Sequence, residues 1–367
     1  MDETRKPAPV KAPAGAAQQP APQETRDTGM KAPTPTLPKG GGAIRGIGEK
    51  FAANPVTGTG SMRVPIATSP SRGGAEPALE LHYDSGSGSS VFGLGWQLSV
   101  PRIARKTDKG LPTYDDRKDV FVLSDAEDLV PVTDDAGNIV TATEGSETVV
   151  TYRPRVEGLF ARIERRVRVD GTTYWRAVTP ANVTSLYGTT AQAQIADPDA
   201  PAKVFSWLLE KTFDDRGNVL LYEYREEDLA NVVGTAPCEA PRLGGTAKIT
   251  NRYLKRIRYG NRTPATPDAT TESNPAASDF LFEVVFDFGE HDPDVPTVEA
   301  ADPATWPVRQ DPFSTFRSTF EVRTYRLCRR VLMFHRMSEL GASPCLVAST
   351  DLYPFTGHMV MILRDAM

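Results

Sequence analysis

The residues best suited to chemistry are two Asp-Ser/Thr-Gly sequences, Asp84-Ser85-Gly86-Ser87 and Asp27-Thr28-Gly29. Peptide hydrolysis by paired aspartates needs two such loops, because the two carboxyl groups must lie close enough to share one proton. Asp27 lies in a stretch rich in Pro and Ala, with no apolar run before it. We therefore interpret the sequence at Asp84 as a glycine-rich turn and assign no catalytic residue.

Two glycine patterns, Gly46-Ile47-Gly48 and Gly58-Thr59-Gly60, have the composition of loops that cradle a phosphate. Such a loop has to follow a strand and open a helix, because the helix N-terminus supplies part of the anion site. Neither pattern has that context. We interpret both as turns at the entrance of a sheet and expect no cofactor.

Cys328 and His335 could form a thiol nucleophile and its base. Seven residues apart on a strand, they would point to opposite faces, and a buried cysteine that only packs is the commoner arrangement. The other histidines, His82, His291 and His358, belong to no spacing typical of a metal site. We therefore predict neither a catalytic thiol nor a metal ligand.

One stretch of the chain is rich in arginine: Arg153, Arg155, Arg162, Arg165, Arg166 and Arg168. Apolar residues alternate with these arginines, which favours the solvated face of a strand over a site for a polyanion. A charged face that lines a cavity would show the same pattern.

The elements that would position these residues are β-strands joined at glycine turns. Residues 79–123 contain an alternating strand, a polar turn and the run Phe92-Gly93-Leu94-Gly95-Trp96. Glycine permits backbone conformations and close approaches that other residues resist. We expect Gly86, Gly88, Phe92, Gly93, Gly95 and Trp96 to determine how this region folds.

Period-two alternation continues through most of the chain. In residues 159–169 the apolar positions share one face, and Phe280, Phe282, Val284, Phe286 and Phe288 alternate against Glu283 and Asp287. Both patterns predict half-buried antiparallel strands. Residues 320–335 fit a strand or a helix, and we favour a strand.

Two similar turns, Asp134-Asp-Ala-Gly-Asn138 and Asp214-Asp-Arg-Gly-Asn218, each lie between strand-like runs. Gly137 and Gly217 would supply the positive φ of a hairpin turn. Four segments rich in Pro, Ala, Thr and Asp are predicted to be surface loops: 196–203, 231–247, 263–278 and 291–312. Residues 1–38 carry few large aliphatic side chains, so we predict a disordered tail.

The composition is that of a globular protein, with 367 residues, 39% hydrophobic and 24% charged residues, and a formal net charge of −5. The small negative charge argues against a dedicated nucleic-acid binder. Three cysteines without a Cys-x-x-Cys spacing argue against a disulfide scaffold. No apolar run approaches the roughly 18 residues of a membrane span, and the N-terminus lacks the apolar core of a secretory signal.

Taken together, these residues resemble the SpvB/TcaC N-terminal domain, that of the Salmonella virulence plasmid 65 kDa B protein family. The resemblance covers roughly residues 37–351 and is carried by ordered runs along the chain. They are Leu37–Ser61, Phe92–Trp96, Arg105–Pro112, Ser124–Pro131 and Arg323–His335.

The resemblance implies a structural role. In the B components of insecticidal Tc toxin complexes, the similar domain begins a large β-sheet shell of Rhs/YD type that encloses a toxic polypeptide. In the virulence protein it precedes a separate ADP-ribosyltransferase domain. Such a transferase needs a Glu-x-Glu pair, and this sequence contains none.

We therefore expect an all-β, largely antiparallel, shell-like domain over residues 39–351, behind the disordered tail and before a divergent end at 352–367. The expected function is a non-catalytic structural module of a bacterial toxin complex, with an A-type translocator and a C-type Rhs/toxin protein as partners. Nucleic-acid binding and direct membrane insertion are not expected. We expect synthesis in the bacterial cytoplasm and secretion without a signal peptide.

Three alternatives remain open. The chain is also consistent with the secretion or targeting module of an SpvB-like ADP-ribosyltransferase whose catalytic domain lies elsewhere. A second alternative is an autonomous hydrolase that uses Asp84. The third is a truncated gene product without function, because part of a shell would leave open sheet edges.

Overall fold

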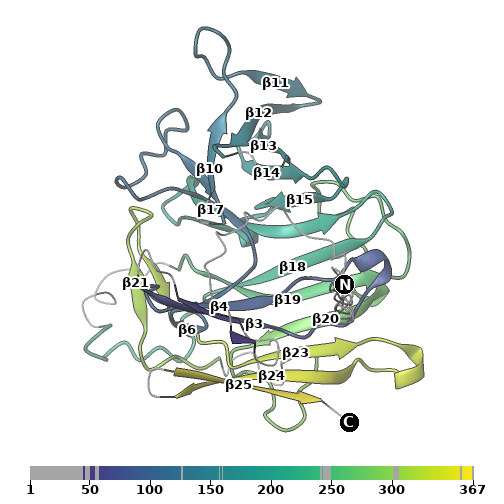
Figure 1. Ribbon diagram of the computed structural model, residues 1–367. Coiled ribbons are helices and arrows are strands. Elements are labelled where there is room, and N and C mark those ends of the chain that lie inside the picture. The colour runs from purple at the N-terminus through teal and green to yellow at the C-terminus, as the bar shows by residue number, and fades with distance from the viewer. Residues whose placement is uncertain are drawn as a thin grey trace, which may run out of the picture.

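The computed structural model describes residues 44–45, 50–53, 58–124, 127–156, 158, 160–239, 242, 249–300, 306–355 and 358–365 (Figure 1). Within this part of the chain the structure is β-strands joined by loops and four short 3₁₀ turns, and every strand pair is antiparallel. The prediction of an all-β, antiparallel fold is confirmed. The predicted tail and the Gly46-Ile47-Gly48 pattern lie outside the described residues.

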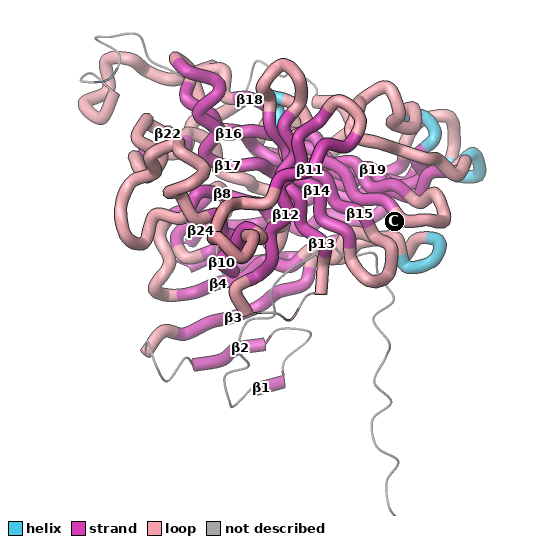
Figure 2. Tube along the Cα trace, turned by 90° about the horizontal axis from the view of Figure 1, so that it is seen from above, coloured by secondary structure: helices cyan, strands magenta, loops and turns pink. Residues whose placement is uncertain are grey.

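The first sheet has five strands in the order β1-β2-β3-β4-β7. Their bounds are β1 Ile44–Arg45, β2 Lys50–Ala53, β3 Gly60–Pro65, β4 Glu80–Asp84 and β7 Trp96–Leu98. A small ribbon of β5 (Ser89–Ser90) and β6 (Gly93–Leu94) connects β4 to β7. Strands β1 and β2 lie at the margin of the molecule in Figure 2.

The second sheet has sixteen strands, and half of them close into a barrel. The barrel order is β15-β14-β13-β12-β10-β9-β8-β17, and a further pairing of β15 with β17 closes the ring. The bounds are β8 Arg102–Arg105, β9 Phe121–Leu123, β10 Glu127–Pro131, β12 Glu147–Pro154, β13 Arg162–Val167, β14 Thr173–Val178, β15 Thr184–Tyr187 and β17 Ala200–Phe213. Two further strands lie off the ring: β11 Thr141–Glu144 pairs with β12, and β16 Gln194–Asp197 pairs with β17.

Aromatic side chains fill the barrel. Phe121 packs edge-on against Trp175 at a centroid distance of 4.9 Å and against Trp207 at 5.8 Å, and none of the three is exposed. Arg105 lies over the Phe121 ring and pairs with Asp119 at 2.7 Å. Since rings of this size fill a closed eight-stranded sheet, the barrel is a packed core.

The long strand β17 leaves the barrel and continues the sheet as β18-β19-β20-β23-β24-β25. These strands are β18 Val219–Glu226, β19 Arg252–Asn261, β20 Phe280–Asp287, β23 Arg330–His335, β24 Cys345–Phe355 and β25 His358–Asp365. A separate ribbon pairs β21 (Phe313–Thr315) with β22 (Val322–Thr324). The five-stranded sheet crosses this open sheet (Figure 1), and Leu81 and Phe92 share one apolar core with Phe286.

Several local predictions were wrong. Residues 196–203 form a hairpin between β16 and β17 instead of a loop. Strand β20 is buried on both faces, because a loop with Val298 packs over the side that carries Val285. For residues 320–335 the preference for a strand over a helix is confirmed, but the segment is divided into two strands with a break between Thr324 and Arg330. A single strand's alternation cannot show what later segments place over its polar face.

Within the described residues, no helix is long and apolar enough to cross a membrane. The short helical elements are 3₁₀ turns at Arg72–Gly74, Ala191–Ala193, Ala277–Asp279 and Ser338–Leu340. Strand β24 runs without a break across the domain end expected at residue 351.

Candidate functional site

The glycine turn before β7 lies beneath an aromatic side chain. Gly95 has φ +79°, and a Cβ built on it would lie 2.6 Å from Tyr83 Cε2 and 2.9 Å from the Asp84 carbonyl oxygen. The ring over Gly95 is that of Tyr83 on the neighbouring strand β4. Tyr83 in turn packs against the buried Trp96 at a centroid distance of 5.2 Å.

The other residues of this turn have different surroundings. Gly93 has φ +105°, a conformation that favours glycine. A Cβ at Gly86 would approach Thr59 Cγ2 at 2.9 Å, whereas one at Gly88 would meet nothing within 4 Å. Phe92 is buried and packs edge-on against Phe286 of β20 at 6.4 Å, so this turn is fastened to the open sheet.

The two Asp-Gly-Asn sequences form the same turn. In each, the first Asp donates its backbone N–H to the Asn carbonyl, and the Asp side chain accepts from the Asn N–H. Gly137 has φ +83° and Gly217 has φ +80°. A Cβ at Gly137 would meet nothing, but one at Gly217 would lie 2.8 Å from the Ala265 backbone nitrogen. The second turn is therefore packed against a loop and the first is not.

The candidate catalytic residues are not brought together. Asp84 accepts a hydrogen bond from the Gly86 N–H at 2.7 Å, which stabilises the turn. Cys328 is buried before β23, and burial raises the pKa of its thiol well above the usual value. His335 lies at the far end of β23, where its Nε2 contacts the Ser69 hydroxyl at 2.6 Å. A buried, protonated thiol remote from the histidine is a poor nucleophile.

The arginine-rich stretch is only in part a solvated face. Arg153, Arg155 and Arg162 are exposed, but Arg166 is buried. Its guanidinium donates to Glu147 at 2.7 Å and to Glu164 at 2.8 Å. The expectation of a solvated face is wrong for this position, because the β11–β12 hairpin brings carboxylates over it.

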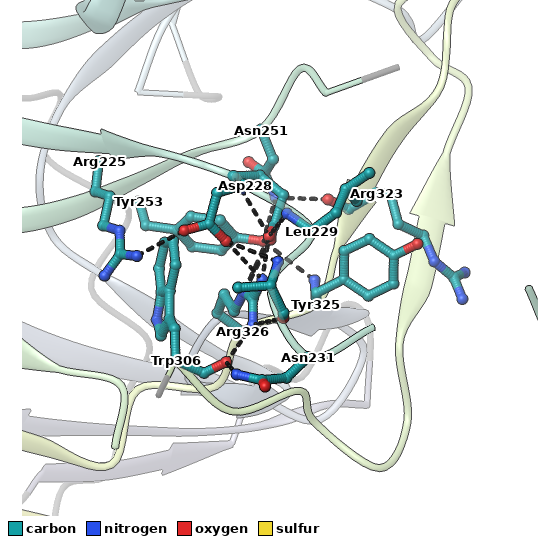
Figure 3. A network of polar contacts seen from close by, with 12 residues as sticks. Arg225, Asp228, Leu229, Asn231, Asn251, Tyr253, Trp306, Arg323, Tyr325 and Arg326 are labelled. Atoms are coloured by element: carbon teal, nitrogen blue, oxygen red, sulfur yellow. Dashed lines mark hydrogen bonds and ion pairs between the residues drawn. The ribbon is translucent and has the colours of Figure 1, made fainter. Parts of the chain in front are cut away.

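A buried polar network that the sequence did not reveal joins four segments of the chain (Figure 3). Arg326, which follows β22, is fully buried and forms a salt bridge with Glu227, which follows β18. Tyr253 of β19 donates its hydroxyl to Glu227 at 2.9 Å, and Arg326 also donates to the Trp306 carbonyl at 2.7 Å. A buried charge pair of this kind is stable only when further hydrogen bonds satisfy both groups.

Stacking extends the same network. The Trp306 ring lies between two guanidinium groups, 3.6 Å from that of Arg225 and 4.5 Å from that of Arg326 (Figure 3). Asn231, which has φ +62°, donates its side-chain amide to the Trp306 carbonyl at 3.0 Å. Arginine above and below an indole is a favourable cation–π arrangement. These contacts hold the loop after β18 against the segment before β21.

A second cluster of titratable groups lies where β20 ends. Asp287, Glu290 and His291 are buried, and their potential ligand atoms all lie within 4.8 Å of one another, as in a metal site. The Lys255 ammonium donates to Glu290 Oε1 at 2.5 Å and contacts His291 Nε2 at 2.8 Å. Two cationic side chains therefore balance this cluster: Lys255 contacts Glu290 and His291, and Arg330 forms a salt bridge with Asp287 at 2.5 Å. The spacing Asp287-x-x-Glu290-His291 is visible in the sequence, but the approach of Lys255 is not.

These arrangements fasten loops to strands, and within the described residues the candidate nucleophile and base do not meet. Their charged side chains form ion pairs within the chain, so these arrangements stabilise the fold.

The family model described as the Salmonella virulence plasmid 65 kDa B protein matches residues 54–337. Mono(ADP-ribosyl)transferase SpvB of Salmonella choleraesuis is 38% identical over 327 residues, which cover 86% of this chain and 53% of that protein. The protein of the same name from Salmonella dublin has the same identity and coverage. The chain thus spans about half the length of these relatives.

Solved structures with this fold are also similar in sequence. The N-terminal domain of effector protein SpvB from Salmonella typhimurium strain LT2 has a TM-score of 0.73 and 37% identity, covering 83% of this chain and 98% of that one. TcdB2-TccC3 has a TM-score of 0.74 and 32% identity, covering 90% and 17%. The Photorhabdus luminescens Tc holotoxin pore has a TM-score of 0.73 and 34% identity, covering 93% and 16%.

Proposed function

Because this chain belongs to the Salmonella virulence plasmid 65 kDa B protein family, we propose that it is a non-catalytic structural module of a bacterial toxin complex. In this role it forms part of the β-sheet shell that encloses a toxic polypeptide and helps to deliver it. Its partners are other toxin-complex components, an A-type translocator and a C-type Rhs/toxin protein.

One observation carries the proposal. The same fold, at 32–37% identity, is the N-terminal domain of an effector and about a sixth of the much longer TcdB2-TccC3 chain and the Tc holotoxin chain. This module occurs in an effector and in Tc toxin chains of very different size. What these proteins share at the module is its fold, so we infer that the module has a structural role. The SpvB relatives are named for a transferase activity, and the solved SpvB domain that this chain matches is N-terminal.

The internal contacts support a structural role. The buried carboxylates Glu227 and Glu290 each receive a cationic side chain, Arg326 and Lys255, and the barrel interior is filled by rings. An enzyme's site instead leaves polar groups that face a space for the substrate. The open sheet and the five-stranded sheet give the broad wall that a shell needs.

The test is limited proteolysis with mass spectrometry on the purified chain, alone and with A-type and C-type Tc components. We expect a partner to protect loops such as residues 263–276 from digestion and to co-elute with the chain on size exclusion. A chain that resists digestion alone but gains no protection from either partner would overturn the proposed assembly.

The second candidate is the secretion or targeting module of an SpvB-like transferase. The specific observation in its favour is the 98% coverage of the SpvB N-terminal domain. We propose for either role that the protein is made in the bacterial cytoplasm and secreted. A fusion of residues 1–367 to a reporter enzyme that reaches host cells without Tc components would favour this candidate over the shell.

The proposed unit is residues 39–351, with a tail before it and a divergent end after it. Within it we propose Gly86, Gly88, Phe92, Gly93, Gly95, Trp96, Gly137 and Gly217 as structural determinants, with no catalytic, cofactor or metal role. Activity that disappears in Asp84→Ala would instead support a hydrolase. Rapid digestion of the whole chain would identify it as a fragment of a longer functional protein.

A further inference from the structure

Residues 289–299, which we name the flap, follow β20 and fold back over the outer face of the open sheet. Val298 of the flap packs with the buried residues Val285, Leu332 and Phe334. Arg256 of β19 donates to the Val298 carbonyl at 3.0 Å, and Arg330 of β23 donates to the Pro293 carbonyl at 2.9 Å. The flap therefore covers an apolar patch on β20 and β23.

His291 is one of the flap side chains that contact the strands, and its two ring nitrogens define its protonation state. Its Nδ1 lies 2.9 Å from the Thr297 carbonyl oxygen, which can only accept, so Nδ1 carries the proton. Its Nε2 lies 2.8 Å from the Lys255 ammonium, which can only donate, so Nε2 must be unprotonated. The closed flap thus requires one neutral tautomer of His291.

A second proton on His291 cannot be accommodated in this arrangement. It would place an N–H⁺ group against an ammonium group at a distance of 2.8 Å. We propose that the flap is an acid-released cover: protonation of His291 separates it from Lys255, opens residues 289–299 and exposes the apolar patch of Val285, Leu332 and Phe334.

The other charged groups around His291 set the strength of this effect. They are Lys255 from β19, Asp287 at the end of β20, Arg330 from β23, and Glu290 and Glu299 from the flap, with the Cys328 thiol nearby. Burial and then Lys255 lower the pKa of His291, whereas Asp287 and Glu290 act in the opposite direction. Arg330 forms a salt bridge with Asp287 at 2.5 Å. The guanidinium balances part of the Asp287 charge, which would otherwise stabilise the His291 imidazolium.

The sign of the pH effect follows from the lowered pKa. An imidazole exposed by the open flap takes up a proton near pH 6.5, and the closed form resists it to a lower pH. The free energy that favours the closed flap is therefore fully present above about pH 6.5 and decreases as the pH falls below it. Between the two pKa values the open fraction rises about tenfold for each pH unit.

Hydrogen–deuterium exchange of the full chain at pH 7.5 and pH 5, corrected for intrinsic exchange rates, tests the proposal. We expect protection factors of flap peptides to fall by about tenfold or more at pH 5, while peptides of the barrel keep theirs. Equal protection of the flap at both pH values would overturn the proposal, since His291 and Lys255 would then separate without opening it.

Two variants remove the proton switch in different ways. In His291→Gln, the side-chain oxygen accepts from Lys255 and does not titrate, so the flap should stay protected at pH 5. In Lys255→Met, the imidazolium can pair with Glu290, so the flap should again stay closed. His335→Gln, on the other side of the sheet core, is the matched control and should open like the wild type. Opening at pH 5 that persists in both His291→Gln and Lys255→Met would overturn the mechanism.

Discussion

Tyr83 lies so close over Gly95 that a side chain at Gly95 has no room: a Cβ there would be 2.6 Å from Tyr83 Cε2. The backbone of Gly95 also has φ +79°, which L-residues adopt at a cost. Strain and overpacking therefore coincide at one residue.

Gly95→Val should lower the free energy of unfolding by about 2–5 kcal/mol, because a β-branched side chain must adopt left-handed backbone and displace the Tyr83 ring. Denaturant unfolding followed by circular dichroism measures the change. Gly88→Ala is the control: its Cβ meets no atom within 4 Å, so the loss should be small. Unchanged melting of Gly95→Val would contradict this account of the turn.

The two Asp-Gly-Asn turns allow backbone strain to be separated from packing. Gly137→Ala and Gly217→Ala introduce the same methyl group at almost the same φ. The first should cost about 1–2 kcal/mol for left-handed backbone alone. The second should cost a further 1–3 kcal/mol, roughly, because its Cβ meets Ala265 and Pro264. Equal losses in the two variants, measured by urea unfolding, would show that the 264–265 loop moves aside freely.

Glu227→Gln tests the buried network. The change removes the Glu227 carboxylate from the fully buried Arg326 and leaves only Asp228, at 3.2 Å, to balance its charge, so we expect a loss of up to about 3–5 kcal/mol in unfolding free energy. The adjacent Glu226 pairs with Arg252 but is 57% exposed, and Glu226→Gln should cost less than about 1 kcal/mol. If thermal denaturation found the two variants alike, the network would not be a determinant of stability.

Thiol reactivity should distinguish Cys328 from Cys238. Cys328 is buried and its pKa is raised by burial, whereas Cys238 is exposed. At pH 8 a disulfide reagent should modify Cys328 at least about a thousandfold more slowly than Cys238, at the rate at which the region unfolds. Cys238→Ser should remove the fast phase. A fast phase assigned to Cys328 by mass spectrometry would be incompatible with its position in the core.

Much of the fold could be predicted from local patterns. Alternation at residues 159–169 and 280–288 marks real strands, β13 and β20, and the Asp-Gly-Asn sequences mark real turns. The burial of Glu283 and Arg166 could not be predicted. Alternation reports one strand's own faces, and each of these side chains is covered by a segment that lies elsewhere in the sequence.

The sequence by itself determined the all-β class, the turns that need glycine and membership of the family, because these depend on residue type and short spacing. Only the tertiary structure decided that β17 closes a barrel through β15, that Arg326 reaches Glu227 and that Lys255 reaches His291. Each of these contacts joins residues at least 22 positions apart, and the shortest separation is that of Tyr187 and Leu209 in the β15–β17 pair. Such contacts are selected by the packing of the whole chain, since no local pattern encodes which distant partner will lie opposite.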